Sequence, residues 1–191
     1  MVTKTYLDPQ SLLDDSFKLG AAILNDGFKP THMIAIWRGG TPVGVAVQEF
    51  LAYHGVKTDH IAIRTSSYSD DIDGRGREVL IHGVDYLVKN ITHQDKLLIV
   101  DDVYDTGHTI AAVIAQLKEK CRLNTPNDIR VAVPYFKPTR NETGVEPDYY
   151  LHETAEWLKY PHSLEGLTVD EIAIHRPELF NIIKHLLPSQ G

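Results

Sequence analysis

The chain has 191 residues, of which 42% are hydrophobic and 24% are charged, as expected for a single soluble globular domain with a substantial core. Its formal net charge of −7 argues against broad binding to nucleic acid or to an anionic membrane surface. Cys121 is the only cysteine, which excludes an internal disulfide. Because there is neither an apolar run near the roughly 18 residues of a membrane span nor a signal peptide, we expect a cytoplasmic protein.

The first predicted element is an amphipathic helix. Asp8 suits the N-cap of this helix and Pro9 its first turn, and residues 25–27, Asn-Asp-Gly, end it. An apolar run at residues 33–37 predicts a buried strand, and residues 38–42, Arg-Gly-Gly-Thr-Pro, form a turn before a second helix. The apolar residues that mark this second helix are Val43, Val47, Phe50 and Leu51.

A long polar segment follows a short strand predicted at residues 61–63. Residues 65–77, TSSYSDDIDGRGR, contain almost no apolar side chains. Taken alone they fit a solvated loop, but a long polar loop between core elements is also where active-site lids occur. The next segment, residues 78–88, is expected to be helical.

The centre of the chain combines an apolar strand, a polar turn and a helix. Residues 97–100, Leu-Leu-Ile-Val, predict a fully buried strand, and apolar residues recur at helical spacing from Ile110 to Cys121. The polar turn between them contains Asp101, Asp102, Asp105, Thr106, Gly107, His108 and Thr109. Backbone N–H groups and Thr hydroxyls in such a turn suit a phosphate, while the carboxylates suit a sugar diol or Mg²⁺.

The last predicted elements are a strand at residues 129–136, expected to end at Pro134 and Pro138, a short run near Leu151 and two tail helices, the second of which begins at Pro177. Strands that alternate with helices predict an α/β fold with a mainly parallel twisted sheet flanked by helices. In such sheets ligands bind beyond the carboxyl ends of the strands. Both the turn after residue 37 and the turn after residue 100 fall there, so we expect them to form one site.

The aspartate spacing separates this turn from similar phosphate sites. A haloacid-dehalogenase-type phosphatase needs Asp-x-Asp, because period-two spacing places both carboxylates on one face of a strand. Here Asp101 and Asp102 are adjacent and Asp105 comes three residues later, so a phosphatase is disfavoured. The sequence at residues 107–109 lacks the Lys of a P-loop, and the glycine pair at residues 39–40 is too short for a dinucleotide-binding motif.

Residues 98–110, LIVDDVYDTGHTI, resemble the phosphoribosyl pyrophosphate (PRPP) binding motif of the type I phosphoribosyltransferases. That motif is an apolar strand, two adjacent acidic residues, two spacers and Asp-Thr-Gly-x-Thr. The resemblance covers roughly residues 8–165 and is nearest to the 6-oxopurine enzymes of hypoxanthine and xanthine-guanine salvage. The supporting segments are the pyrophosphate loop at residues 37–40, the start of a flexible catalytic loop at Ser66-Ser67-Tyr68, Lys137 after the next strand, and Trp157-Leu158 with Pro161.

The resemblance implies roles for the matching residues on the PRPP side. Asp101 and Asp102 would hold the ribose hydroxyls, directly or through Mg²⁺, and residues 105–109 would wrap the 5-phosphate. Arg38 and Gly39 would bind pyrophosphate, and the Trp37–Arg38 peptide bond is expected to be cis. Closure of the loop at residues 65–77 would let Arg75 or Arg77 reach the pyrophosphate.

On the base side, the resemblance implies that Asp105 faces N7 of the purine and accepts its proton, with Asp105 and Arg38 as the catalytic pair. Lys137 would donate to the exocyclic O6, which selects 6-oxopurines over adenine because adenine would set donor against donor. Trp157 and Leu158 would form part of the base pocket.

The implied protein is therefore a Mg²⁺-dependent purine salvage enzyme that converts PRPP and hypoxanthine, guanine or xanthine to a nucleoside monophosphate and pyrophosphate. Two alternatives stay open: a phosphoribosyltransferase for another nucleobase, such as uracil or orotate, and a non-catalytic PRPP-binding regulator of the same fold. We expect small-molecule substrates only, no nucleic-acid or membrane partner, and a homo-oligomer, either a dimer or a tetramer. The single domain would comprise a core at about 30–137, a hood at about 138–166 with the N-terminal segment, and C-terminal helices at 167–191.

Overall fold

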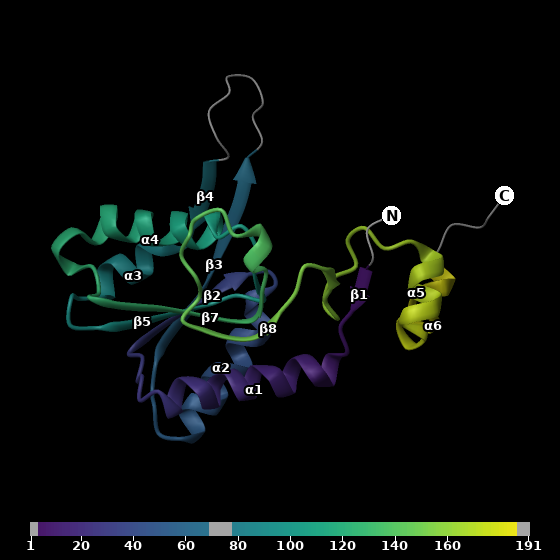
Figure 1. The fold of residues 1–191 in the computed structure, drawn as a ribbon, viewed down its shortest axis with the longest axis horizontal. Helices are drawn as coiled ribbons and strands as arrows, with labels where there is room; N and C mark the ends of the chain where they lie inside the picture. The colour runs from purple at the N-terminus through teal and green to yellow at the C-terminus, as the bar shows by residue number, and fades with distance from the viewer. Residues whose placement is uncertain (1–3, 69–77, 187–191) are drawn as a thin grey trace.

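The computed structural model describes residues 4–68 and 78–186. Its main sheet has the strand order β4-β3-β2-β5-β7-β6, with β8 beside β7 (Figure 1). Every neighbouring pair runs parallel except β3 and β4. The predicted α/β fold with a mainly parallel sheet flanked by helices is thus confirmed. The strands of this sheet are β2 His32–Trp37, β3 Asp59–Tyr68, β4 Glu78–His82, β5 Lys96–Val100, β6 Val103–Tyr104, β7 Asp128–Phe136 and β8 Tyr149–Glu153.

Helices cover both faces of this sheet, as Figure 1 shows. Helices α1 (Pro9–Asn25) and α2 (Gly40–Tyr53) pack on one face, and α3 (Val84–Asn90) and α4 (His108–Cys121) pack on the other. Strand residues alternate between the two cores, as the period of a strand requires: Leu97 and Ile99 face α3 and α4, whereas Leu98 and Val100 face α1 and α2. Burial on both faces explains why the central strands are continuously apolar.

The first helix begins and ends as the sequence predicts. Asp8 is the N-cap of α1, and its side chain accepts a hydrogen bond of 2.8 Å from the backbone N–H of Ser11. Pro9 occupies the first helical position, where its missing N–H costs nothing. The helix ends at Asn25, and Gly27 follows with a φ of 76°.

The structure corrects the prediction for residues 65–88. Strand β3 continues to Tyr68, so Ser66, Ser67 and Tyr68 belong to a strand. The segment predicted to be helical starts instead with β4, which pairs antiparallel with β3, and the helix α3 begins only after Gly83. Gly83 has a φ of 96°, a left-handed conformation that interrupts any helix running through it. Arg75 and Arg77 lie outside the described residues.

A second correction concerns Pro134, which lies inside β7 and does not end it. Strand β7 pairs with β5 as far as Ala132. On the same edge it then pairs with β6 from Tyr135 onward. Pro134 falls between these paired residues, opposite the turn at residues 101–102. A residue without an N–H is accommodated there because the ladder is already interrupted.

A small sheet and two helices complete the fold. Strand β1 (Lys4–Tyr6) pairs in parallel with β9 (Trp157–Lys159). Helix α5 (Val169–His175) contacts β1 through the stacked rings of Tyr6 and His175, and helix α6 (Pro177–Ile183) packs against α5 (Figure 1). The two short tail helices with Pro177 at the start of the second are as predicted. The division into core, hood and C-terminal helices stays a prediction. Across residues 4–68 and 78–186, no helix is both long enough and apolar enough to span a bilayer.

Candidate functional site

Three residues predicted for the site follow directly on three parallel strands. Arg38 follows β2, Asp101 follows β5 and Lys137 follows β7. Since β2, β5 and β7 run parallel and adjacent, their carboxyl ends lie at one edge of the sheet. This is the edge at which open parallel sheets bind their ligands.

The loop after β2, residues 38–39, touches the segment between β5 and α4, residues 101–107, which we call the acidic turn. A Cβ atom on Gly39 would lie 1.9 Å from Asp102 Oδ2, and one on Gly40 would lie 2.6 Å from the backbone oxygen of Val100. Only glycine permits this approach, because any side chain would overlap the acidic turn. The peptide bond between Trp37 and Arg38 is cis, as expected from the resemblance.

Asp101 and Asp102 form a pair of half-buried carboxylates beneath that loop. The backbone N–H of Asp102 donates a hydrogen bond of 2.9 Å to Asp101 Oδ1. Burial raises the pKa of both carboxyl groups, and for Asp101 the charge of Asp102 raises the pKa further. A cation or a set of hydroxyl donors at this position would therefore stabilise the ionised pair.

The rest of the acidic turn leads into α4. Gly107 has a φ of 84° and precedes His108, the first residue of this 14-residue helix, so the turn lies at the positive end of the helix dipole. Thr106 lies in the same turn, and Thr109 is the second residue of α4. Residues 141–143 support the turn from the side: a Cβ on Gly107 would lie 2.6 Å from Thr143 Oγ1, and His108 Nε2 lies 2.7 Å from Glu142 Oε2.

The Asp105 carboxylate lies between two cationic side chains, those of Lys137 and Arg140. Its Oδ2 lies 3.6 Å from Lys137 Nζ, and its Oδ1 lies 2.7 Å from Arg140 Nε. Lys137 is only 4% exposed, so the Asp105 carboxylate compensates a buried ammonium group. The same ammonium group lies 5.7 Å from the ring centroid of Trp157. The structure thus brings together Asp105, Lys137 and Trp157, which are far apart in the sequence.

Leu158 behaves differently from its neighbour Trp157. Adjacent strand residues point to opposite faces, and the Leu158 side chain packs against the core beneath α1 and α2. Trp157 remains 46% exposed. Of the two residues predicted for the base pocket, Trp157 therefore shares the surroundings of Lys137, and Leu158 fixes the strand that carries it.

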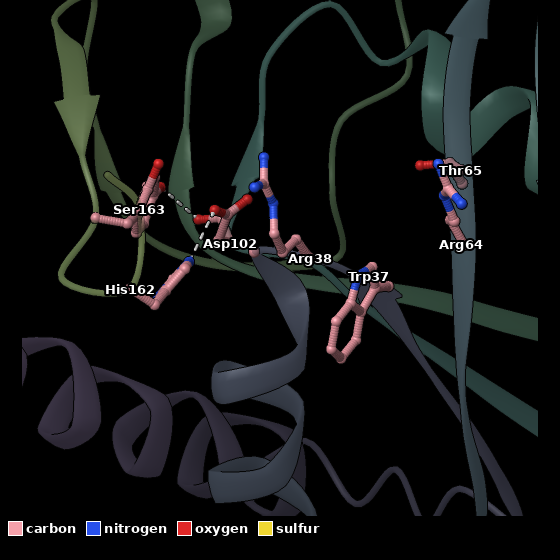
Figure 2. Close-up of a pocket in the computed structure, with 9 residues that line it drawn as sticks. Trp37, Arg38, Arg64, Thr65, Asp102, His162 and Ser163 are labelled. Atoms are coloured by element: carbon pink, nitrogen blue, oxygen red, sulfur yellow. Dashed lines mark hydrogen bonds and ion pairs between the residues drawn. The ribbon is translucent and has the colours of Figure 1, made fainter. Parts of the chain in front are cut away.

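A cavity of about 580 Å³ opens beside the acidic pair (Figure 2). Figure 2 shows Asp102 between Arg38 and the turn that carries His162 and Ser163, with Arg64 and Thr65 on β3. Three residues predicted for PRPP binding line this cavity, namely Arg38, Gly39 and Asp102. The Nη2 atom of Arg38 lies 2.8 Å from Glu165 Oε2, an exposed ion pair at the rim.

The wall formed by residues 160–163 could not be predicted from the sequence. Buried Tyr160 donates a hydrogen bond of 2.9 Å from its hydroxyl to the backbone oxygen of Asp102, and His162 Nε2 lies 4.0 Å from Asp102 Oδ2. Partial burial lowers the pKa of His162, and the charges of Arg176 and Arg38 lower it further. Pro161 belongs to the segment that resembles the purine-contacting part of the 6-oxopurine enzymes, but His162 is one of ten scattered histidines and nothing in its spacing distinguishes it.

Residues 2–170 of the chain match the family model for the phosphoribosyl transferase domain. The chain belongs to this family. A comparison with curated protein sequences finds no match.

Solved structures similar to this phosphoribosyl transferase domain include enzymes and a nucleotide-binding protein. A purine phosphoribosyltransferase from Pyrococcus horikoshii is 27% identical, with a TM-score of 0.65 over 86% of this chain and 97% of that one. A hypothetical protein from Neisseria gonorrhoeae with bound ppGpp is 22% identical, with a TM-score of 0.72 over 95% and 98%. The xanthine-guanine-hypoxanthine phosphoribosyltransferase of Helicobacter pylori is 18% identical, with a TM-score of 0.63 over 93% and 99%.

Phosphoribosyltransferases use PRPP together with Mg²⁺, and the acidic pair fits this ion. Asp101 and Asp102 offer carboxylate oxygens, which Mg²⁺ prefers. Within the described part of the chain, no group of three or more His, Cys, Asp or Glu side chains is arranged to hold a metal. A Mg²⁺ ion here would take its remaining ligands from PRPP and water, which is its usual behaviour in phosphate sites.

Proposed function

We propose that this phosphoribosyl transferase domain is a purine salvage enzyme that transfers the 5-phosphoribosyl group of PRPP to a 6-oxopurine. The observation that carries the proposal is the juxtaposition of two features at one sheet edge. The loop at residues 38–39 and the adjoining Gly40 pack against Asp101 and Asp102, and together they suit a pyrophosphorylated ribose. The buried Lys137, beside Asp105 and Trp157, suits a purine with an oxygen at C6.

On the PRPP side, Asp101 and Asp102 bind the ribose hydroxyls, directly or through Mg²⁺. Residues 105–109 bind the 5-phosphate with backbone N–H groups and the hydroxyls of Thr106 and Thr109, at the start of α4. The Arg38 guanidinium and the backbone N–H of Gly39 bind pyrophosphate. Asp101 and Asp102 would hold a Mg²⁺ ion, which would supply positive charge opposite the pyrophosphate.

The reaction breaks the bond between C1 of the ribose and pyrophosphate and forms a bond from C1 to a purine nitrogen. Positive charge develops on the sugar ring and negative charge on the leaving group. Arg38 and the backbone N–H groups of its loop stabilise the leaving group. The sugar cation reacts with water when exposed, so the wall of the cavity must exclude water during transfer.

On the base side, the Lys137 ammonium group donates to O6 of the purine, and Asp105 accepts the proton lost from N7. The two cations beside Asp105 hold its carboxylate in one orientation. Adenine has an amino group in place of O6, so it would meet Lys137 donor against donor. A site that hydrogen-bonds one group discriminates strongly against a substrate that lacks it, here by at least about a hundredfold.

The direct test measures initial rates of pyrophosphate release with Mg²⁺, PRPP and single bases. We expect turnover with hypoxanthine, guanine or xanthine, and rates at least about a hundredfold lower with adenine, uracil and orotate. Lys137→Met, which keeps the volume of the buried side chain, should remove most of the discrimination between hypoxanthine and adenine. Turnover confined to adenine or to a pyrimidine would contradict the proposal.

A second candidate function is nucleotide sensing without catalysis. The likeness to the Neisseria gonorrhoeae protein with bound ppGpp favours it, because that structure covers 95% of this chain. ppGpp, like PRPP, carries pyrophosphate on a phosphorylated ribose, and Arg38 and Arg64 line the cavity beside the acidic pair. The chain has two tryptophans, Trp37 and Trp157, and both lie at the candidate site, so intrinsic fluorescence reports binding. Saturable binding of ppGpp with no turnover on any base would favour the sensor.

A further inference from the structure

Arg176 links the C-terminal segment to the wall of the cavity. It lies between α5 and α6, beyond residue 170, where the family match ends. Its Nη1 donates hydrogen bonds to the backbone oxygens of Pro161, at 3.1 Å, and Ser163, at 2.9 Å, and its Nη2 donates to that of Tyr160 at 2.6 Å. One guanidinium group therefore binds three carbonyls of a single turn, residues 160–163.

This turn is the part of the cavity wall that faces the acidic pair (Figure 2). The backbone N–H of Ser163 donates 3.0 Å to the oxygen of Tyr160, which closes the turn. Side chains of Tyr160, His162 and Ser163 line the cavity, and the Tyr160 hydroxyl is bonded to the backbone of Asp102. Displacement of the turn would move all three side chains relative to Asp102.

The arrangement requires arginine in particular. The guanidinium group presents five N–H donors in a planar fork, so it can reach carbonyls that point in different directions from one turn. A lysine at the same position has one ammonium group on a flexible stem and cannot occupy all three directions with the same geometry. Arg176 thus fixes the shape of the turn as well as its location.

The scaffold that carries Arg176 is itself held in place. A capping box between Thr168 and Glu171 begins α5, and the Glu171 carboxylate also pairs with Lys4 and accepts a hydrogen bond of 3.2 Å from the Tyr6 hydroxyl. The rings of Tyr6 and His175 stack with centroids 3.8 Å apart. Strand β1 therefore anchors α5, and β1 pairs with β9, which carries Trp157.

We propose that Arg176 is a positioning residue for the ligand cavity: it holds the turn at residues 160–163 against Asp102 and so sets the wall that PRPP contacts. The effect on PRPP rests on the proposed function, whereas the effect on the turn does not. The C-terminal segment thereby acts on the site without contacting a ligand.

The first test measures amide hydrogen exchange in Arg176→Lys and Arg176→Ala. We expect protection in peptides that span residues 160–167 to fall at least tenfold in Arg176→Ala and less in Arg176→Lys, with β5 unchanged. Arg130→Lys is the matched control. Arg130 forms ion pairs with Asp26 and Asp128 and donates a hydrogen bond to the Tyr149 hydroxyl. It lies near the start of β7, at the opposite end of the strand from Lys137. Unchanged exchange at residues 160–167 in both Arg176 variants would overturn the inference.

The second test separates positioning from a general loss of stability. Partial unfolding lowers the active fraction, and hence the apparent kcat, without changing the KM for PRPP. We expect the KM for PRPP to rise at least tenfold in Arg176→Ala, an intermediate rise in Arg176→Lys, and no change in Arg130→Lys even where its Tm falls. A changed exchange pattern with unchanged KM would overturn the positioning role.

Failure of the proposed function gives a different result. If the wild-type chain turns over no base, tryptophan fluorescence titrations with PRPP and ppGpp replace the KM measurement. Weaker binding of either compound to both Arg176 variants, with exchange changed at residues 160–167, supports positioning in a binding protein. Equal binding to the wild-type chain and to both variants overturns it.

Discussion

Gly39 is the residue at which the loop after β2 meets the acidic turn after β5. A Cβ atom there would lie 1.9 Å from Asp102 Oδ2, so Gly39→Ala must displace either the loop or the carboxylate. Overpacking of this kind costs about 1–3 kcal/mol, or roughly 5- to 150-fold in affinity. We expect calorimetric titration with Mg²⁺ and PRPP to show a loss in this range. Glu49→Ala, on the exposed side of α2, should bind as the wild type does, and unchanged affinity in Gly39→Ala would contradict the assignment.

Asp105 combines an electrostatic role with the proposed role of proton acceptor. Asp105→Asn removes both the proton acceptor and the charge that compensates the buried Lys137. Loss of a general base lowers kcat by about 10²–10⁴. Steady-state rates with the best 6-oxopurine should therefore fall by this factor, while PRPP affinity changes much less. Glu119→Gln alters an exposed acid near the other end of α4, away from the turn, and should retain activity. An undiminished kcat in Asp105→Asn would remove Asp105 from the mechanism.

At the scale of single elements, the sequence predicts best where the signals are local. The unit formed by β5, the acidic turn and α4 is contiguous in the sequence. The Asp8 N-cap and Pro177 each determine the start of a helix through residues within one turn of it. Strands β1 and β9 were not predicted, because each has three residues and each forms only by pairing with the other, about 150 positions away. The helix predicted at residues 78–88 is confirmed for residues 84–88 and wrong for residues 78–82, which form β4 only by pairing with β3.

The attachment of α5 to β1 should depend on pH through Glu171. The hydrogen bond from Lys4, with one from the backbone of Thr168, holds the pKa of Glu171 at about 2, below its ordinary value of 4.5. A depressed folded-state pKa contributes stability that is complete above pH 4.5 and is lost as the pH falls toward 2. Glu171→Gln lacks this contribution but keeps a side chain suited to the capping box.

We therefore expect the difference in Tm between the wild type and Glu171→Gln to be constant above about pH 5 and to shrink progressively below pH 4.5. Thermal unfolding followed by circular dichroism measures it. Glu178→Gln, an exposed carboxyl in the first turn of α6, serves as the control. A Tm difference that stays constant down to pH 3 would show that the Lys4 pair does not set the pKa of Glu171.

At the scale of the whole molecule, the fold class and the acidic turn between β5 and α4 could be predicted from the sequence, because strand, turn and helix are contiguous. The grouping of Asp105, Lys137 and Trp157 and the cavity wall could not, and the binding roles of all these residues stay predictions. Lys137 and Trp157 were identified only through a resemblance, and their proximity to Asp105 arises from packing of separate strands. The turn at residues 160–163 is held by Arg176, whose hydrogen-bond partners are backbone oxygens. Every residue has a backbone oxygen, so the sequence cannot indicate which ones Arg176 contacts.

The central claim, transfer of phosphoribosyl from PRPP to a 6-oxopurine, is tested most directly by competition. The wild-type chain is incubated with Mg²⁺, PRPP and an equimolar mixture of hypoxanthine, guanine, xanthine, adenine, uracil and orotate, and the nucleoside monophosphates are identified by mass. Product ratios then give relative kcat/KM values. We predict at least about a hundredfold more 6-oxopurine nucleotide than all other nucleotides combined. A pyrimidine or adenine nucleotide as the main product, or no nucleotide at all, would contradict the claim.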